Sequence, residues 1–144
     1  MNPQERLSKL IEKAECLLAK SDALTIAYLC EDGSPRASTI SIMKAEGIRT
    51  ICMSTAMQAL KTKRIQRNPR VSLCVRSGSN NVTLTGTVAV SQDDVLRKAL
   101  WKDWCIQHFP DGATGKSFCI LIFTMEEATF WIDGEGGVAS QEAL

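Results

Sequence analysis

The chain has 144 residues, of which 44% are hydrophobic and 23% charged, and its formal net charge is +1. This length predicts one domain with a buried core, and the near-neutral charge argues against a dedicated nucleic-acid binder or a polybasic membrane anchor. No apolar run approaches the roughly 18 residues of a membrane helix, and the N-terminus lacks the apolar core of a signal peptide. We therefore expect a cytoplasmic protein that binds neither membrane nor nucleic acid.

The N-terminal segment predicts an amphipathic helix over residues 3–20, because Asn2 and Pro3 are typical of a helix start and apolar residues then recur at helical spacing. Two β-rich segments follow, residues 23–30 and 35–43. Asp32-Gly33 between them is typical of a hairpin turn. A third strand is predicted over residues 48–53.

Residues 55–69, TAMQALKTKRIQRNP, predict a second helix. Thr55 and Gln58 have the spacing of a capping box, and Pro69 disfavours helical dihedrals at Asn68, so we expect the helix to end there. Free N–H groups at a helix start attract anions, and Lys61 lies about one to one and a half turns into this helix. The segment is therefore either a phosphate site or a surface helix with solvated basic residues.

The second half of the chain predicts strands over residues 71–76 and 82–90, and the latter alternates cleanly between apolar and polar residues. Gly86 within it indicates a bulge or a close approach by a ligand or another backbone. A long helix is expected from residues 91–94 to about 107, then strands over 117–124 and 128–132 and a Gly-rich tail over 133–144. Hairpin links and this density of strands predict a small antiparallel barrel over residues 23–132.

The cysteines and the single histidine give no sign of metal or nucleophile chemistry. No C-x-x-C pair occurs, so neither a zinc site nor a disulfide framework is indicated, and we expect reduced cysteines that pack as small apolar side chains. Cys105 and His108 have the spacing of a nucleophile pair, but no third orienting residue is evident. The cysteines are Cys16, Cys30, Cys52, Cys74, Cys105 and Cys119.

The order of elements and several motifs resemble the pyridoxamine 5′-phosphate oxidase superfamily, and within it the general-stress-protein-26-like branch. The motifs are Gly33-Ser34-Pro35, the segment 55–61 with Asn68-Pro69, the strand 81–86, the segment 100–110 and Phe130-Trp131. The resemblance implies a mainly β fold with flanking helices, namely a six-stranded antiparallel split β-barrel. It also implies a homodimer that binds FMN non-covalently at its interface.

The resemblance implies a cofactor site made of Arg36, Ser38, Thr39, Ile40, Ser54, Thr55, Lys61, Asn81 and Trp131. Thr55 and Lys61 match positions that contact the FMN phosphate, and the strand 38–42 matches the segment along the ribityl chain and ring. Asn81 and Trp131 match positions near the flavin, the second often from the partner subunit. From the residues alone, Asn81 equally suits a turn, and Trp131 equally suits packing at the barrel end. Trp101 and Trp104 are interpreted as helix packing.

Two departures from the family's pattern bear on activity. Family oxidases carry Arg at the position of Ser38 and Lys at that of Met43. Arg36 keeps the strand parity of Ser38 and is a candidate replacement, whereas Lys44 points to the opposite face. The tail over 134–141 also lacks the Arg and His that would hold a pyridoxamine phosphate. We therefore expect no true pyridoxamine-phosphate oxidase activity.

The resemblance implies a flavin-dependent oxidoreductase of unknown substrate, in which FMN exchanges a hydride at its N5. No side chain is identified as the catalytic acid or base. Two other classes stay open: a flavin-binding stress or redox-sensor protein without turnover, and a related barrel that binds deazaflavin F420 or haem. Nucleic-acid binding by the basic residues of the segment 61–70 is disfavoured, because no aromatic residues interleave with them for base stacking.

Overall fold

Seven strands, three α-helices and two 3₁₀ turns make up the computed structural model, which describes all 144 residues. The first half contains α1 (Pro3–Ala19), β1 (Ala23–Leu29), β2 (Pro35–Glu46), β3 (Thr50–Ala56), α2 (Leu60–Arg67) and β4 (Arg70–Ser77). The second half contains β5 (Asn80–Ser91), α3 (Asp94–Leu100), η1 (Asp103–Gln107), β6 (Phe118–Ile132), β7 (Glu135–Ser140) and η2 (Gln141–Ala143). None of the helices combines the length and the apolar character needed to cross a bilayer.

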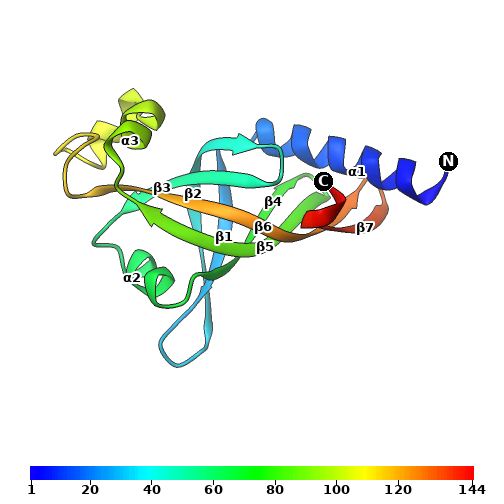
Figure 1. Ribbon diagram of the computed structural model, residues 1–144, viewed down its shortest axis with the longest axis horizontal. Coiled ribbons are helices and arrows are strands. Elements are labelled where there is room, and N and C mark those ends of the chain that lie inside the picture. Colours follow the sequence, from blue (N-terminus) through cyan, green and yellow to red (C-terminus); the bar gives the residue numbers. More distant parts are fainter.

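Six of the strands close into an antiparallel barrel. Hydrogen bonds join the strands in the order β3-β2-β1-β4-β5-β6-β7, and β3 also pairs with β6. Because β6 is 15 residues long, its first half pairs with β3 and its second half with β7, which lies outside the closed ring. The predicted six-stranded barrel is thus confirmed. In Figure 1, α1 and β7 lie toward one end of the molecule, and α2 and α3 lie toward the other.

The barrel interior is filled by the inward-facing residues of each strand. On β5 the predicted alternation is confirmed: Val82, Leu84 and Val88 are buried, while the threonines between them are less so. The predicted N-terminal helix is also confirmed. It contributes Leu10, Ala14 and Leu18 to the core at four-residue spacing, as expected for a helix with one apolar face.

Gly86 has both of the roles that its place in a strand indicates. The register of β5 against β6 shifts between Thr85 and Gly86, which marks a bulge. A Cβ atom at Gly86 would lie 2.0 Å from the carbonyl oxygen of Thr124. Only glycine leaves room for this close approach of two backbones.

The predicted capping box at Thr55 is wrong. Strand β3 continues to Ala56, because Thr55 pairs with Cys119 and Ala56 with Phe118 on β6. Helix α2 starts at Leu60 instead, and its N-cap residue Ala59 makes no side-chain cap bond. Pairing with a strand more than sixty residues away overrides the local cap signal. The helix ends at Arg67, next to the expected limit.

The predicted helix from residues 91–94 to about 107 is interrupted. Helix α3 ends at Leu100, and Trp101 is extended before the chain enters η1. The Trp101 ring packs edge-on against Phe118, with ring centroids 5.0 Å apart. A second, smaller core forms here between α3, η1 and the outside of the barrel, made of Met43, Cys52, Leu100, Cys105, Phe109, Phe118 and Ile120.

The last part of the chain is more ordered than its composition predicts. The two short strands expected over 117–124 and 128–132 are one continuous strand, β6. The segment expected as a Gly-rich tail contains β7, in which Gly137 pairs with Phe130. A Cβ atom at Gly137 would lie 2.8 Å from the Leu10 side chain. Glycine therefore serves here to let α1 pack closely on β7, and does not mark a loop.

Candidate functional site

A hollow of about 280 Å³ lies where β2 and β3 meet the start of α2 and the turn η1. This volume is at the lower limit of the roughly 300–1,000 Å³ typical of small-molecule sites, so the hollow suits part of a larger ligand. Its lining combines hydroxyl groups, one lysine, one histidine and two other aromatic rings, and contains no carboxylate. The residues are Thr39, Ile40, Ser41, Ser54, Thr55, Ala56, Lys61, Trp104, His108 and Phe109.

The register of β2 against β3 brings the hydroxyl groups together. Ser41 pairs with Ser54, and Thr39 follows on the same face of β2 two residues away. Ser54 and Thr55 are 7% and 9% exposed, and neither hydroxyl group makes a hydrogen bond within the chain, although neither oxygen atom is completely buried. These two hydroxyls are therefore available to a ligand in the hollow.

Lys61 provides a cation in the first turn of α2. Its Nζ atom donates only to the backbone oxygen of Thr39, at 3.4 Å, and it has no acidic partner. Partial burial disfavours the charged form and lowers the pKa of Lys61 below the ordinary value for lysine. The first N–H groups of α2 also have no side-chain cap. An anion in the hollow would meet an unpaired ammonium group, a helix start and several hydroxyls.

The turn η1 brings two residues to this hollow that sequence reasoning did not place in a site, Trp104 and His108. Their rings are edge-on to one another, with centroids 5.9 Å apart. Trp104 is 39% exposed, so its expected role in packing a continuous helix is wrong. The sequence around these two residues does not predict this position, because the position depends on the interruption of the helix at Trp101.

Cys105 and His108 do not form a nucleophile pair. The Cys105 side chain is fully buried in the second core, and its Sγ accepts a hydrogen bond from the backbone N–H of Lys102 at 3.4 Å. His108 is exposed to the hollow instead. The thiol therefore caps the turn and does not face the imidazole.

Five of the nine predicted cofactor residues line the hollow: Thr39, Ile40, Ser54, Thr55 and Lys61. The structure places Ser38 just outside it, with a buried hydroxyl that has no hydrogen-bond partner. Arg36 lies at the hairpin end of β2, where its guanidinium donates to Ser34 Oγ at 3.0 Å and to the oxygen of Pro35 at 3.1 Å. Arg36 is thus absent from the lining of the hollow.

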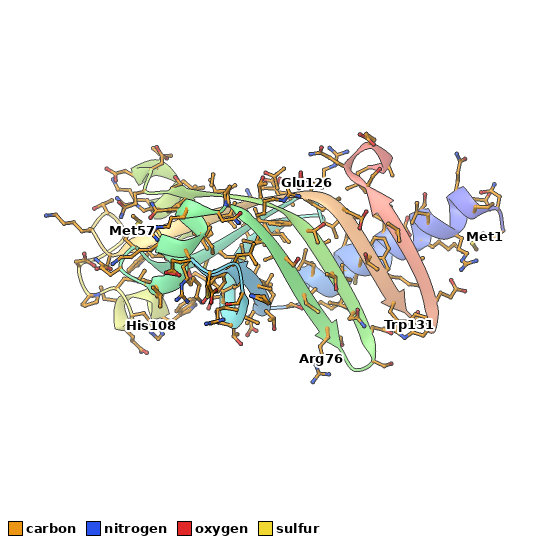
Figure 2. All side chains as sticks on the ribbon, turned by 90° about the horizontal axis from the view of Figure 1, so that it is seen from below. Met1, Met57, Arg76, His108, Glu126 and Trp131 are labelled. Atoms are coloured by element: carbon orange, nitrogen blue, oxygen red, sulfur yellow. The ribbon has the colours of Figure 1, made fainter.

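Asn81 and Trp131 lie at the other end of the sheet. The two residues face each other across β5 and β6. Figure 2 shows Trp131 toward one end of the long axis and His108 toward the other. The Trp131 side chain is 49% exposed, so it does not plug the barrel. Within one chain, neither residue shares a site with Lys61.

A larger hollow of about 480 Å³ lies beside α1, and of its four charged side chains all except Lys20 already have partners within the chain. Lys13 donates to Asp133 at 2.8 Å, and Arg76 donates to the oxygen of Gly78 at 3.0 Å. Most of the basic residues around α2 are likewise solvated or paired: Arg64 with Glu31 and Arg70 with Glu126. The hollow at Lys61 is therefore the better candidate for an anionic ligand.

Comparisons with known proteins bear on the fold. A profile of the family described as pyridoxamine 5′-phosphate oxidase matches residues 10–132. A solved Clostridium acetobutylicum protein, related to general stress protein 26 of Bacillus subtilis, superposes with a TM-score of 0.84 at 20% identity, over 93% of this chain and 96% of that one. No curated protein matches the sequence significantly.

Two further solved structures share the fold and differ in their ligands. A haem-binding protein from Mycobacterium smegmatis has a TM-score of 0.74 at 19% identity, over 93% of this chain and 59% of that one. An FMN-binding protein from Nostoc punctiforme, related to pyridoxamine 5′-phosphate oxidase, has a TM-score of 0.66 at 15% identity, over 97% of both chains. At these identities the likeness establishes the architecture of the chain and leaves the ligand to the residues of the site.

Proposed function

The chain belongs to the pyridoxamine 5′-phosphate oxidase family, and from that premise we propose that it is an FMN-binding flavoprotein acting as a flavin-dependent oxidoreductase. The observation that carries the proposal is the hollow that Lys61, which has no acidic partner, lines together with Ser54 and Thr55, whose hydroxyls make no hydrogen bond within the chain. This donor set suits a phosphate group. An FMN-binding neighbour of the same fold supports the choice of ligand.

The hollow would take the phosphate end of the cofactor. Lys61 would hold the phosphate as a point charge, and Thr55 would donate a hydrogen bond from its hydroxyl. The start of α2 adds N–H groups and the positive end of the helix dipole. From there, Thr39 and Ile40 on β2 provide a path for the ribityl chain toward the ring.

A single chain offers only part of such a site. FMN is too large for a hollow of about 280 Å³, and Asn81 and Trp131 lie at the far end of the same sheet. We therefore propose a homodimer in which Asn81 and Trp131 of the partner subunit complete the flavin pocket. The half-exposed Trp131 indole supports this reading, because it would be covered by the ligand and the second copy.

When bound, FMN would supply the redox chemistry by accepting or donating a hydride at its N5. The chain's part is to bind, to orient the ring and to exclude water. The segment 134–141 offers neither Arg nor His, and β7 places it against α1 and β6. We therefore do not propose that pyridoxamine phosphate is the substrate.

The test is the affinity for FMN of Lys61→Ala, measured by quenching of flavin fluorescence. A charge-assisted contact contributes about 1.5–3 kcal/mol, so we expect FMN binding to weaken about tenfold or more. Lys63→Ala, an exposed position on the same helix, is the matched control and should bind FMN as the wild type does. Riboflavin, which lacks the phosphate, should bind Lys61→Ala and wild type equally.

Equal FMN affinity in Lys61→Ala and wild type would refute the proposed phosphate site. The variant should remain folded, because the unpaired and partly buried ammonium has no acidic partner whose loss would destabilise the chain. A thermal melt of both proteins without ligand checks this point.

Haem is a second candidate ligand, favoured by the haem-binding neighbour of the same fold. The absorbance spectrum of the purified protein separates the candidates, because oxidised flavin absorbs near roughly 450 nm and haem gives a Soret band. If flavin is bound, bleaching of its absorbance by NADH or NADPH distinguishes an oxidoreductase from a sensor or flavin store.

A further inference from the structure

His108 gives the hollow a second basic group besides Lys61, and its side chain makes no hydrogen bond within the chain. Building on the proposed phosphate-bearing cofactor, we propose that His108 is the second phosphate contact of the site. It would take up a proton as the phosphate binds, so that the affinity for the ligand depends on pH near neutrality.

The charge of a phosphate leaves room for a second cation in the hollow. A phosphate monoester carries a charge of about −1.5 to −2 at neutral pH, and Lys61 can neutralise about one unit of it. The lining contains no other basic side chain except His108, and no carboxylate to compete for either cation. A protonated imidazole would donate a charge-assisted hydrogen bond to the remaining phosphate oxygens.

The position of His108 is fixed by the packing on both sides of it. The backbone N–H of His108 donates to Cys105 O at 3.0 Å, and Cys105 is completely buried. The next residue, Phe109, is 6% exposed and packs against Phe118 with ring centroids 4.9 Å apart. The Trp104 ring contacts the imidazole edge-on, with ring centroids 5.9 Å apart. The turn therefore holds the imidazole at the hollow without using either ring nitrogen.

The groups around His108 determine the sign of the pH dependence. Lys61 of α2 is the only other titratable side chain of the lining, while β2 and β3 contribute only hydroxyls and apolar groups there. Lys102 and Asp103 lie earlier on the same turn, and the Asp111 carboxylate is engaged by the backbone N–H of Ser117 at 3.1 Å.

Imidazole titrates near neutral pH, and a phosphate beside it favours the charged form. Binding of the phosphate therefore takes up a proton. Affinity should rise as the pH falls from 8 to about 6.5, and should level off when the phosphate itself becomes protonated near pH 6.

Because the chain has a single histidine, proton uptake by His108 can be measured directly. Its imidazole Cε1 proton gives one unambiguous NMR resonance, which is titrated with pH in the free protein and with FMN, riboflavin or inorganic phosphate. We expect FMN to raise the titration midpoint and riboflavin to leave it unchanged. Wild type should therefore bind FMN more tightly at pH 6.5 than at pH 8. His108→Gln should lose this pH dependence, whereas Gln107→Ala, an exposed neighbour, should keep it.

The outcomes separate this inference from the proposed function. If FMN binds but neither the His108 resonance nor the affinity of His108→Gln changes, the inference is overturned and the flavoprotein stands. If FMN does not bind but inorganic phosphate raises the midpoint, FMN as the ligand is refuted and His108 remains a phosphate contact. If no phosphate compound affects the resonance, the phosphate contact at His108 is wrong for any such ligand.

Discussion

Replacing Arg97 by Met tests how the fold holds α3 against the start of β6. Arg97 is 4% exposed and joins α3 to the start of β6. Its Nη1 atom donates to Gly115 O at 2.6 Å and to Phe118 O at 2.9 Å, and its Nη2 donates to Asp94 Oδ1 at 2.8 Å. Methionine keeps much of the apolar stem but none of the donors.

The size of the expected loss in stability follows from the carbonyl groups that lose their donor. Gly115 O loses its side-chain donor, whereas Phe118 O keeps a longer bond of 3.3 Å from Gln92. The Gly115 carbonyl is only partly buried, so leaving it without a donor costs near the lower end of about 1–3 kcal/mol, and the lost charge-assisted contacts add to this. Part is recovered, because the buried Nε of Arg97 has no partner and its desolvation is relieved. We expect a net loss of about 2–4 kcal/mol in the free energy of unfolding, or about 10 °C in Tm.

Urea unfolding followed by tryptophan fluorescence and far-UV circular dichroism measures this loss. Arg70→Met is the matched control, because Arg70 forms an ion pair with Glu126 at 2.8 Å but its side chain is 64% exposed. Exposed pairs contribute at most about 1 kcal/mol. If the two variants unfold within about 0.5 kcal/mol of each other, the buried guanidinium does not hold α3 as described.

Two further predictions concern the barrel. Gly86→Ala places a Cβ 2.0 Å from Thr124 O and should destabilise the fold by about 1–3 kcal/mol in urea unfolding. Gly136→Ala is the control and should not destabilise it, because its nearest neighbour is at 3.7 Å. Equal stability of the two variants would contradict the close approach of the two backbones at Gly86. Burial raises the pKa of the Cys119 thiol to about 11, so this thiol should stay protonated and unreactive in native protein at pH 8. With a disulfide thiol reagent only the accessible thiols should react before urea is added, and rapid reaction of more than three would contradict the packing of Cys52, Cys105 and Cys119.

Local patterns in the sequence were sufficient to predict most strands and turns of the barrel. The hairpin at Asp32-Gly33 and the alternation of β5 depend on neighbours within a few residues, and both are confirmed. The start of α2 could not be found in this way. Thr55 has the pattern of a helix cap, but its backbone is committed to a strand by its pairing with Cys119. Such pairing depends on the closure of the whole barrel, and no sequence pattern near Thr55 predicts it.

The site was predictable only in part for the same reason. Lys61 and Thr55 follow from a motif within one segment, and the structure brings both to one hollow. Trp104 and His108 reach that hollow because the helix is interrupted at Trp101, whose ring packs on Phe118. Residues 101 and 118 meet only in the folded chain. A sequence pattern that is compatible with a continuous helix does not contain this information.

The contrast between Arg97 and Lys61 shows how the chain separates structure from function. Both carry their charge at least partly out of water. Arg97 has three acceptors for its guanidinium, so its burial stabilises the contact between α3 and β6. Lys61 has one long bond and no counter-ion, and its pKa is lowered by desolvation alone. A cation left unsatisfied in this way contributes little to the fold by itself. Under the proposed function, its place in the same hollow as Ser54 and Thr55 is explained by an anion that the chain does not itself provide.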